Sequence, residues 1–262
     1  MLKKLIASAV VLVCFGGMAT ANPFAEKVCT TYTMPNGWEC VRVPAGTSWN
    51  RFVPDEEYRS MIKRYNRQNT ILHAGQFLVI PPNTGWNNLA PFDQTGHSDR
   101  VDVIVFDPQR LAWAHYLNGR LITWGPAVGG KDWCPDKNNR RGGPCRTDVG
   151  TFHFTEAADA TRRSNAYPIN CGQPGGRPCA AMPYFTRFTS DGQGIHKRSM
   201  RGANASHGCI GVFAEDAQYI NGHVRARVGK QDHGYFTERE KAASSERVLF
   251  RVLPYSSSVP NS

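Results

Sequence analysis

The sequence lacks a long run of basic residues, although its formal net charge is +10. The 31 Lys and Arg residues are scattered, and their closest groupings are pairs such as Arg140-Arg141 and Arg162-Arg163. No nucleic-acid-binding motif accompanies them, so we expect no nucleic-acid partner. A basic surface suits an anionic polymer, and general solubility explains the same charge equally well.

The sequence also lacks an apolar run long enough to span a membrane comfortably. Its N-terminal apolar run, residues 5–17, follows two lysines and precedes the small-residue site Ala19-Thr20-Ala21. This pattern is typical of a secretory signal peptide, so we expect cleavage after residues 1–21 and export to the periplasm or cell envelope. Cys14 lies inside the run and does not follow a small residue, which argues against a lipid anchor.

Zinc-ligand spacing is absent from the cysteines. In an exported protein most of the seven that follow the signal segment should be paired, and three neighbouring pairs enclose short loops rich in Gly, Pro or Asn: Cys29–Cys40, Cys134–Cys145 and Cys171–Cys179. Spacing alone leaves the connectivity open, but these spacings are longer than the ligand pairs of structural zinc sites. Cys209 is left over, and an unpaired thiol in an oxidising compartment is a candidate nucleophile.

Two segments precede the β-rich part of the chain. We expect residues 22–42 to be a looped lead segment. Residues 43–83 begin with Val43-Pro44-Ala45-Gly46-Thr47-Ser48-Trp49, continue with helical spacing up to Tyr65 and end with Gly75-Gln76-Phe77-Leu78-Val79-Ile80-Pro81. This segment resembles a LysM module, although its middle departs from the usual two-helix body. The resemblance implies binding to peptidoglycan glycan, and a small spacer without a ligand is the alternative.

Short strands dominate after residue 100. The polar stretch 84–99 predicts a linker, which Trp86 and Phe92 pack against one of the domains. Asn118-Gly119 predicts a hairpin, and the regular spacing of strands predicts a mainly β fold, a sandwich or barrel. A short helix is expected over 215–220 and a disordered tail over 255–262. The expected strands cover residues 101–106, 111–116, 121–124, 149–154, 182–188, 194–196, 210–213 and 247–253.

The stretch Ser206-His207-Gly208-Cys209 places a thiol beside a glycine and an imidazole, thirteen residues after His196. A cysteine thiol titrates near pH ~8.5, so it needs a base to attack at neutral pH. In a strand, His207 would lie about 7 Å from the cysteine, whereas His196 can fold back onto it, and we favour His196 as the base. Gly208 allows nearby amides to converge on an oxyanion, and Ser206 hydrogen-bonds locally or orients His207. A buried structural cysteine beside turn histidines is the alternative.

Gly194-Ile195-His196 followed by Ser206-His207-Gly208-Cys209 resembles the catalytic signature of the L,D-transpeptidases of YkuD type. Met182-Pro183-Tyr184-Phe185 and Asp148-Val149-Gly150-Thr151-Phe152 resemble two further segments of that family, and the likeness covers about residues 100–254. It implies a β-sandwich-like catalytic domain with Cys209 as nucleophile and His196 as base. It also implies oxyanion or substrate contacts at Ser206, His207, Gly208 and Tyr184.

The resemblance implies an enzyme that remodels peptidoglycan without metal or cofactor. Cys209 attacks the stem tetrapeptide before its terminal D-Ala, and an amine resolves the thioester, giving a 3-3 cross-link or attachment of a protein lysine. With water as acceptor the enzyme is an L,D-carboxypeptidase. Gly211 departs from the family, which usually has an arginine there. Its role then passes to Lys197, Arg198 or Arg201, or the chain is a non-catalytic cell-wall binding protein.

Overall fold

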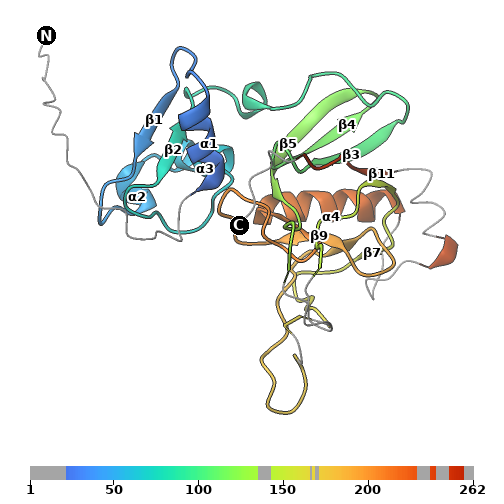
Figure 1. The fold of residues 1–262 in the computed structure, drawn as a ribbon. Coiled ribbons are helices and arrows are strands. Elements are labelled where there is room, and N and C mark those ends of the chain that lie inside the picture. Colours follow the sequence, from blue (N-terminus) through green and yellow to red (C-terminus); the bar gives the residue numbers. More distant parts are fainter. Residues whose placement is uncertain are drawn as a thin grey trace, which may run out of the picture.

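The structure is a computed structural model that describes residues 22–134, 143–165, 167–168, 171–228, 237–239 and 248–256. The expected signal peptide, residues 1–21, lies outside these ranges. Most of the expected tail over 255–262 also lies outside them. Within them, no helix is both long and apolar enough to cross a membrane. The chain forms a small N-terminal body and a larger β-rich body, joined by an extended connection (Figure 1).

The N-terminal body contains a two-stranded antiparallel sheet and three helices. Its elements are α1 (Pro23–Thr31), β1 (Glu39–Arg42), α2 (Trp49–Phe52), α3 (Glu56–Tyr65) and β2 (Phe77–Ile80), with β1 paired to β2. The prediction of a looped lead segment over 22–42 was wrong. Asn22 caps α1 by accepting a hydrogen bond from the amide of Ala25, and Pro23 occupies the first turn, both good helix-start signals.

Two helices, α2 and α3, lie between the two strands of this body, so the expected departure from a two-helix body was also wrong. Each helix begins at a side-chain cap: Ser48 accepts from the amide of Arg51, and Asp55 accepts from the amide of Tyr58. The core of the body includes Trp49, Ile62 and Leu78.

The three predicted disulfides are all present: Cys29–Cys40, Cys134–Cys145 and Cys171–Cys179. Cys29–Cys40 joins α1 to β1 and therefore ties the helix to the small sheet. Cys209 is the free cysteine among the described residues, as predicted.

The larger body is built on one nine-stranded sheet in the order β6-β11-β3-β4-β5-β10-β9-β8-β7. Asn118 and Gly119 both have positive φ and form the predicted hairpin between β4 and β5. The β segment expected over 182–188 is paired only at β8, because the chain turns at Tyr184. The strands are β3 (Asp102–Asp107), β4 (Ala112–Leu117), β5 (Arg120–Val128), β6 (Gly150–Phe152), β7 (Glu156–Ala157), β8 (Thr186–Arg187), β9 (Gly194–Lys197), β10 (Ile210–Val212) and β11 (Leu249–Val252).

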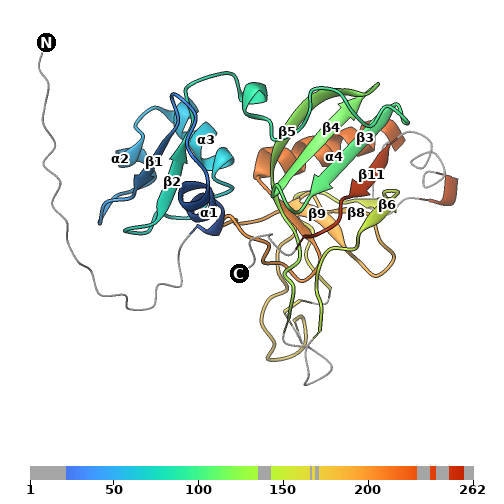
Figure 2. The ribbon, with the colours of Figure 1, turned by 45° about the horizontal axis from the view of Figure 1, so that its top comes forward.

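The sheet curls around α4 (Ala214–Val228), which packs on its inner face (Figure 2). This helix is longer than the one predicted over 215–220. Ala217, Ile220 and Val224 follow helical spacing and contribute to the core with strand residues such as Ile104. The mainly β fold was therefore predicted correctly, although a single curled sheet with a helix inside it takes the place of two facing sheets.

Both faces of β3–β5 are covered, and the connection between the bodies forms part of the outer cover. Val103 and Val105 face outward and are buried with Met61 of α3 and Leu89, which ends the short 3-10 helix η1 (Trp86–Leu89). Trp86 stacks on Trp124 with ring centroids 4.0 Å apart. This packing places the linker against the β-rich body, as predicted for Trp86 and Phe92.

Candidate active site

Strands β9 and β10 place Cys209 and His196 on the same face of the sheet. The strands are parallel, and Gly211 is the partner of His196. Cys209 directly precedes β10 and is level with Gly194. Side chains alternate along a strand, and Ile195 and Ile210 both enter the core with α4. The alternation therefore directs Cys209 and His196 to the opposite face.

Cys209 is a half-buried thiol surrounded by backbone. Its Sγ lies 3.9 Å from the carbonyl oxygen of Gly192. Burial raises the pKa of Cys209, while the amide of Gly194 and the guanidinium of Arg198 act in the opposite direction. Since burial outweighs them, the thiol is protonated at neutral pH and needs a base before it can attack.

His196 has the protonation state that a base requires. Its Nδ1 lies 2.8 Å from the carbonyl oxygen of Lys197, to which it donates. The proton on Nδ1 leaves Nε2 as an acceptor in the neutral imidazole. Burial lowers the pKa of His196 to about 4, and the bond to Lys197 opposes the shift only partly. The ring is therefore neutral at physiological pH.

The turn before Cys209 is fixed by a buried hydroxyl. The Oγ of Ser206 accepts from the amide of Gly208 at 3.1 Å and donates to the carbonyl oxygen of Cys209. Gly208 has φ of +116°, a conformation that other residues rarely adopt. Ser206 therefore shapes the turn, and it directs the Gly208 amide into the turn.

Two further buried side chains hold this turn, and sequence analysis missed both. Thr147 donates from Oγ1 to the carbonyl oxygen of Gly208 at 2.8 Å and accepts from the amide of Gly130 at 3.0 Å. Asn204 accepts from the amide of Gly129 at 2.7 Å through Oδ1. Thr147 lies beside a segment that the family resemblance had singled out, which was the available signal, whereas nothing in the sequence singled out Asn204.

The two other predicted site residues, His207 and Tyr184, make contacts outside the turn. His207 is exposed, and its ring centroid lies 4.9 Å from that of Tyr167. The hydroxyl of Tyr184 accepts from Nε2 of Gln218 at 2.9 Å, so the structure anchors Tyr184 on α4.

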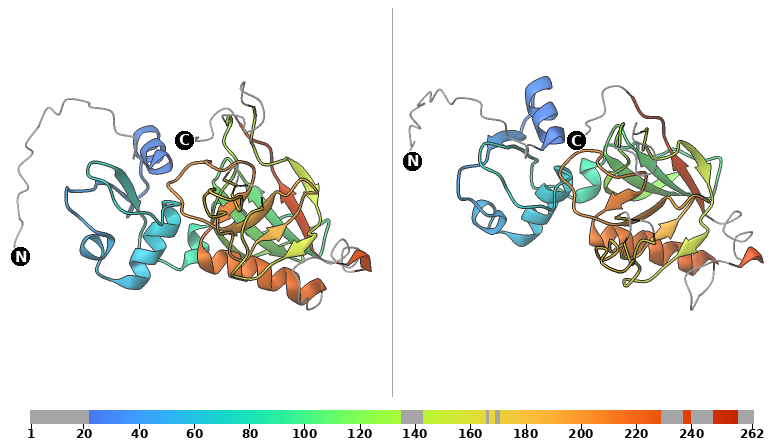
Figure 3. Two further views of the ribbon diagram at one scale, coloured as in Figure 1. Left: turned by 90° about the horizontal axis from the view of Figure 1, so that it is seen from below. Right: turned by 60° about the horizontal axis from the view of Figure 1, so that its bottom comes forward.

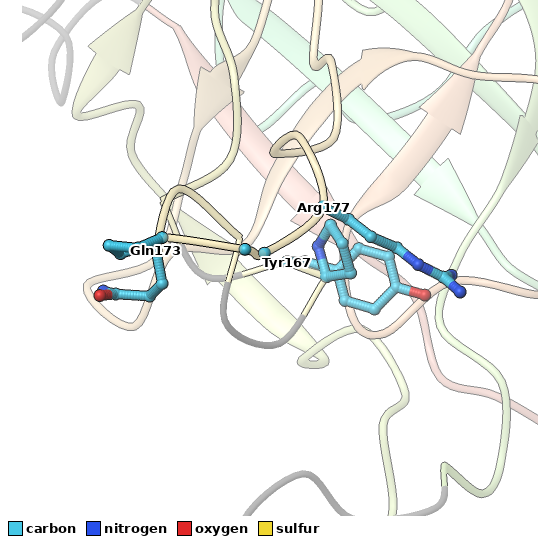
Figure 4. A pocket seen from close by; sticks show the side chains of 7 residues that line it. Tyr167, Gln173 and Arg177 are labelled. Carbon is cyan, nitrogen blue, oxygen red and sulfur yellow. The ribbon is translucent and has the colours of Figure 1, made fainter.

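A groove of about 610 Å³ lies in the loop that carries Tyr167. Tyr167 and Arg177 lie at one end of it and Gln173 at the other (Figure 4). The Cys171–Cys179 disulfide closes the loop that carries Gln173 and Arg177. Through Tyr167, the groove is next to His207 of the turn that precedes Cys209.

Arg198 occupies the space beside Gly211. A Cβ atom added at Gly211 would lie 2.7 Å from Cβ of Arg198 and 2.8 Å from its Cδ, closer than such atoms approach. The guanidinium of Arg198 donates through Nη2 to the carbonyl oxygen of Ala205 at 3.2 Å. Gly211 therefore leaves room for a cation that follows β9, lies over β10 and partly opposes the rise in the pKa of Cys209 that burial causes.

The loop between His196 and Cys209 is bound by the N-terminal body (Figure 3). Asn69 donates from Nδ2 to the carbonyl oxygen of Arg198 at 3.0 Å and accepts from the amide of Met200 at 2.8 Å. The amide of Gly202 donates to Arg67, and its carbonyl accepts from the amide of Phe24. Arg64 of α3 also pairs with Asp216 of α4 at 2.8 Å.

Comparison with known proteins gives one family. Residues 100–232, just over half of the chain, match YkuD, the L,D-transpeptidase catalytic domain. No curated protein matches the chain.

Solved structures of L,D-transpeptidases match this chain at low identity. The one from Stackebrandtia nassauensis is 15% identical over 64% of this chain, which spans only 62% of that protein, with a TM-score of 0.40. The one from Xylanimonas cellulosilytica is 16% identical over 73% of this chain and 78% of its own, with a TM-score of 0.46. The one from Mycobacterium smegmatis is 15% identical over 83% and 92%, with a TM-score of 0.38. On the match over residues 100–232, the chain belongs to the YkuD family of L,D-transpeptidase catalytic domains.

Proposed function

We propose that the protein is an exported L,D-transpeptidase that acts on the stem peptides of peptidoglycan. The observation that carries the proposal is a free Cys209 in a fixed turn, on the same sheet face as a neutral His196. The three disulfides support export, because disulfides persist in oxidising compartments.

The proposed reaction uses Cys209 as nucleophile and His196 as base. Nε2 of His196 takes the thiol proton as Sγ attacks the carbonyl carbon before the terminal D-Ala. The amide of Cys209 holds the oxyanion of the tetrahedral intermediate. The C–N bond then breaks, His196 returns the proton to the departing amine of D-Ala, and a thioester remains. An acceptor amine attacks the thioester, loses its proton to His196, and the thiol is regenerated.

Arg198 takes the place of the arginine that the family usually has at the position of Gly211. It fills the space over Gly211 and partly opposes the rise in the pKa of the Cys209 thiol that burial causes. Neither Lys197 nor Arg201 is needed for this role, since both are exposed. In this proposal Arg198 supplies the cation that the family usually has at position 211, so the glycine there does not prevent catalysis.

The groove beside His207 suits an acidic peptide. Arg177 supplies a cation, and Tyr167 supplies an aromatic face next to the catalytic turn. Stem peptides carry carboxylates, which pair with guanidinium groups. We therefore assign the donor stem peptide to this side of the turn.

The N-terminal segment 43–83 is proposed to bind glycan. Its two strands with two helices between them support a LysM-like module. A pull-down on purified sacculi tests this proposal separately, with Cys209→Ala as the variant that binds but does not react. Failure of the full chain to sediment with sacculi refutes glycan binding.

The reaction is tested by incubating the protein with a disaccharide-tetrapeptide and following the products by mass spectrometry. We expect the wild type to release D-Ala and to form dimers. The Cys209→Ala variant should give neither product. Loss of D-Ala alone identifies an L,D-carboxypeptidase. If the wild type shows no turnover and gains no mass from a carbapenem while its Cys209 is reduced, the enzyme proposal is wrong and a non-catalytic wall-binding protein is favoured.

A further inference from the structure

A cluster of metal-ligand side chains lies between α4 and the inner face of the sheet, at the end of β3–β5 remote from Cys209. Asp102 begins β3, His115 lies in β4 and His223 lies in α4. One ligand atom from each lies within 4.8 Å of the others, and no second group of this kind occurs in the part of the chain that the structure describes.

The two histidine-to-aspartate distances in the cluster are slightly shorter than the distance between two ligand atoms of a bound zinc ion. Nε2 of His115 lies 3.0 Å from Oδ1 of Asp102, and Nε2 of His223 lies 2.9 Å from Oδ2. A tetrahedral zinc ion with bonds of roughly 2.1 Å holds neighbouring ligand atoms about 3.4 Å apart. Outward shifts of a few tenths of an ångström would therefore admit an ion, which would replace the imidazole protons at both Nε2 atoms.

The surroundings orient one ligand and leave another accessible. Nδ1 of His115 lies 2.6 Å from the hydroxyl of Tyr219, one turn before His223 on α4. Metal-binding histidines typically hold their second ring nitrogen in such a bond. Asp102 and His115 are buried, whereas the side chain of His223 is 16% exposed, so an ion can enter from that side.

Arg227 is the competing cation. Its Nε lies 3.1 Å from Oδ2 of Asp102, and its side chain is 44% exposed. Without an ion, Arg227 and the two imidazoles satisfy the carboxylate by hydrogen bonds alone. With an ion, Arg227 must withdraw to solvent, which its exposure permits. Removal of Arg227 should therefore raise the affinity for metal. A purely structural hydrogen-bond network does not predict this increase.

The geometry points to a zinc site formed by Asp102, His115 and His223 that clamps α4 onto the sheet, with water as the remaining ligand. Two imidazoles and one carboxylate suit first-row divalent ions, and zinc fits a tetrahedral set of this kind. The site is remote from the thiol and plays no part in the reaction proposed above. In the sequence analysis the family resemblance implied no metal, and only the cysteines were weighed as zinc ligands.

Metal titration of untagged full-length protein tests the site. A Cys209→Ser background removes the thiol as a competing ligand, and a chelator removes metal before titration. Zinc is followed by calorimetry and cobalt by visible absorption. We expect one ion per chain, a cobalt spectrum of tetrahedral type, and a higher melting temperature with zinc than with chelator.

Three variants decide the result. His223→Gln should lower the zinc affinity at least about 100-fold, and Arg227→Ala should raise it about tenfold. His153→Gln, an exposed histidine outside the cluster, should change nothing. Absence of binding overturns the proposal, as does unchanged affinity in His223→Gln. Weaker binding in a folded Arg227→Ala protein also overturns it.

Discussion

Exchange of the side chains at positions 198 and 211 tests whether Arg198 has taken over the role of the arginine missing from β10. Arg198→Ala removes the guanidinium that lies over Gly211, and with it a charge that opposes the rise in the pKa of Cys209 caused by burial. Removal of one preorganised charge or donor from an acyl-transfer site costs about 10²–10³ in rate. Because Arg198 is half-buried and solvent partly screens it, we expect a loss of about 10- to 100-fold.

The rescue variant is dictated by the contacts. An arginine at position 211 clashes with Arg198, because its Cβ would lie 2.7 Å from the Cβ of Arg198. Alanine at position 198 keeps that Cβ, so the exchange must be Arg198→Gly combined with Gly211→Arg. Gly211→Arg alone should destabilise the fold by about 1–3 kcal/mol through overpacking. The double variant should relieve the clash and restore at least about tenfold of the lost rate, since it returns a cation to the same space.

The assay is the second-order rate of acylation by a carbapenem, followed by intact-protein mass spectrometry. Lys197→Ala is the matched control, because Lys197 is an exposed cation next to Arg198 on the chain. We expect its rate to stay within about twofold of wild type. Wild-type acylation by a folded Arg198→Ala protein would refute the reasoning, as would a folded double variant no faster than Arg198→Gly.

Four further predictions concern the same turn and its supports. Acylation should be flat from about pH 5 to 8 and decline near pH 4, since the pKa of His196 is lowered to about 4; a pH–rate profile declining near 6.5 contradicts this. The same shift makes the folded state less stable as pH falls from 6.5 to about 4, by about 3 kcal/mol, because only the unfolded chain takes up that proton; urea unfolding of wild type against His196→Gln should show the difference, and parallel curves exclude it. Thr147→Val should cost about 1–3 kcal/mol in urea unfolding, because it leaves Gly130 and Gly208 without their buried partner, and an unchanged unfolding midpoint contradicts it. Asn69→Ala should slow carbapenem acylation severalfold while leaving the helical circular-dichroism signal unchanged, since Asn69 holds the loop between His196 and Cys209, whereas Asn87→Ala in η1 is the control that should acylate at the wild-type rate.

Local sequence signals predicted the strands and the disulfides because each depends on neighbours in the chain. Asn118-Gly119 specifies a hairpin by its own backbone preference. The cysteine pairs enclose loops of a few residues, so proximity in sequence was enough. The helix over 23–31 was missed although Asn22 and Pro23 carried its start signals, because the cysteine loop was interpreted as a stapled coil.

Tertiary contacts decided what the sequence could not reveal. The helix α4 continues past Asn221 and Gly222, which are weak helix formers, because Val224 and Ile220 are buried under the sheet. Cys209 and His196 could be named from the signature, but the neutral state of His196 depends on burial and on a carbonyl that only the fold supplies. Thr147 acts across 61 residues of chain on the carbonyl of Gly208, and no pattern in the sequence expresses that bond.

The N-terminal body is placed to do more than the glycan binding proposed for it, because it also contacts the loop between His196 and Cys209. Asn69 bonds to Arg198 and Met200 at the start of the loop between His196 and Cys209, and Gly202 is bonded by the backbone of Arg67 and of Phe24. A Cβ at Gly202 would lie 2.0 Å from Oδ1 of Asn22, so the two bodies meet there too closely for any other residue. Since the same loop connects the proposed base to the proposed nucleophile and starts with the cation over Gly211, removal of the N-terminal body would free the first half of this loop. We therefore expect the β-rich body alone to lose acylation as well as wall binding, whereas a simple tether would leave carbapenem acylation intact.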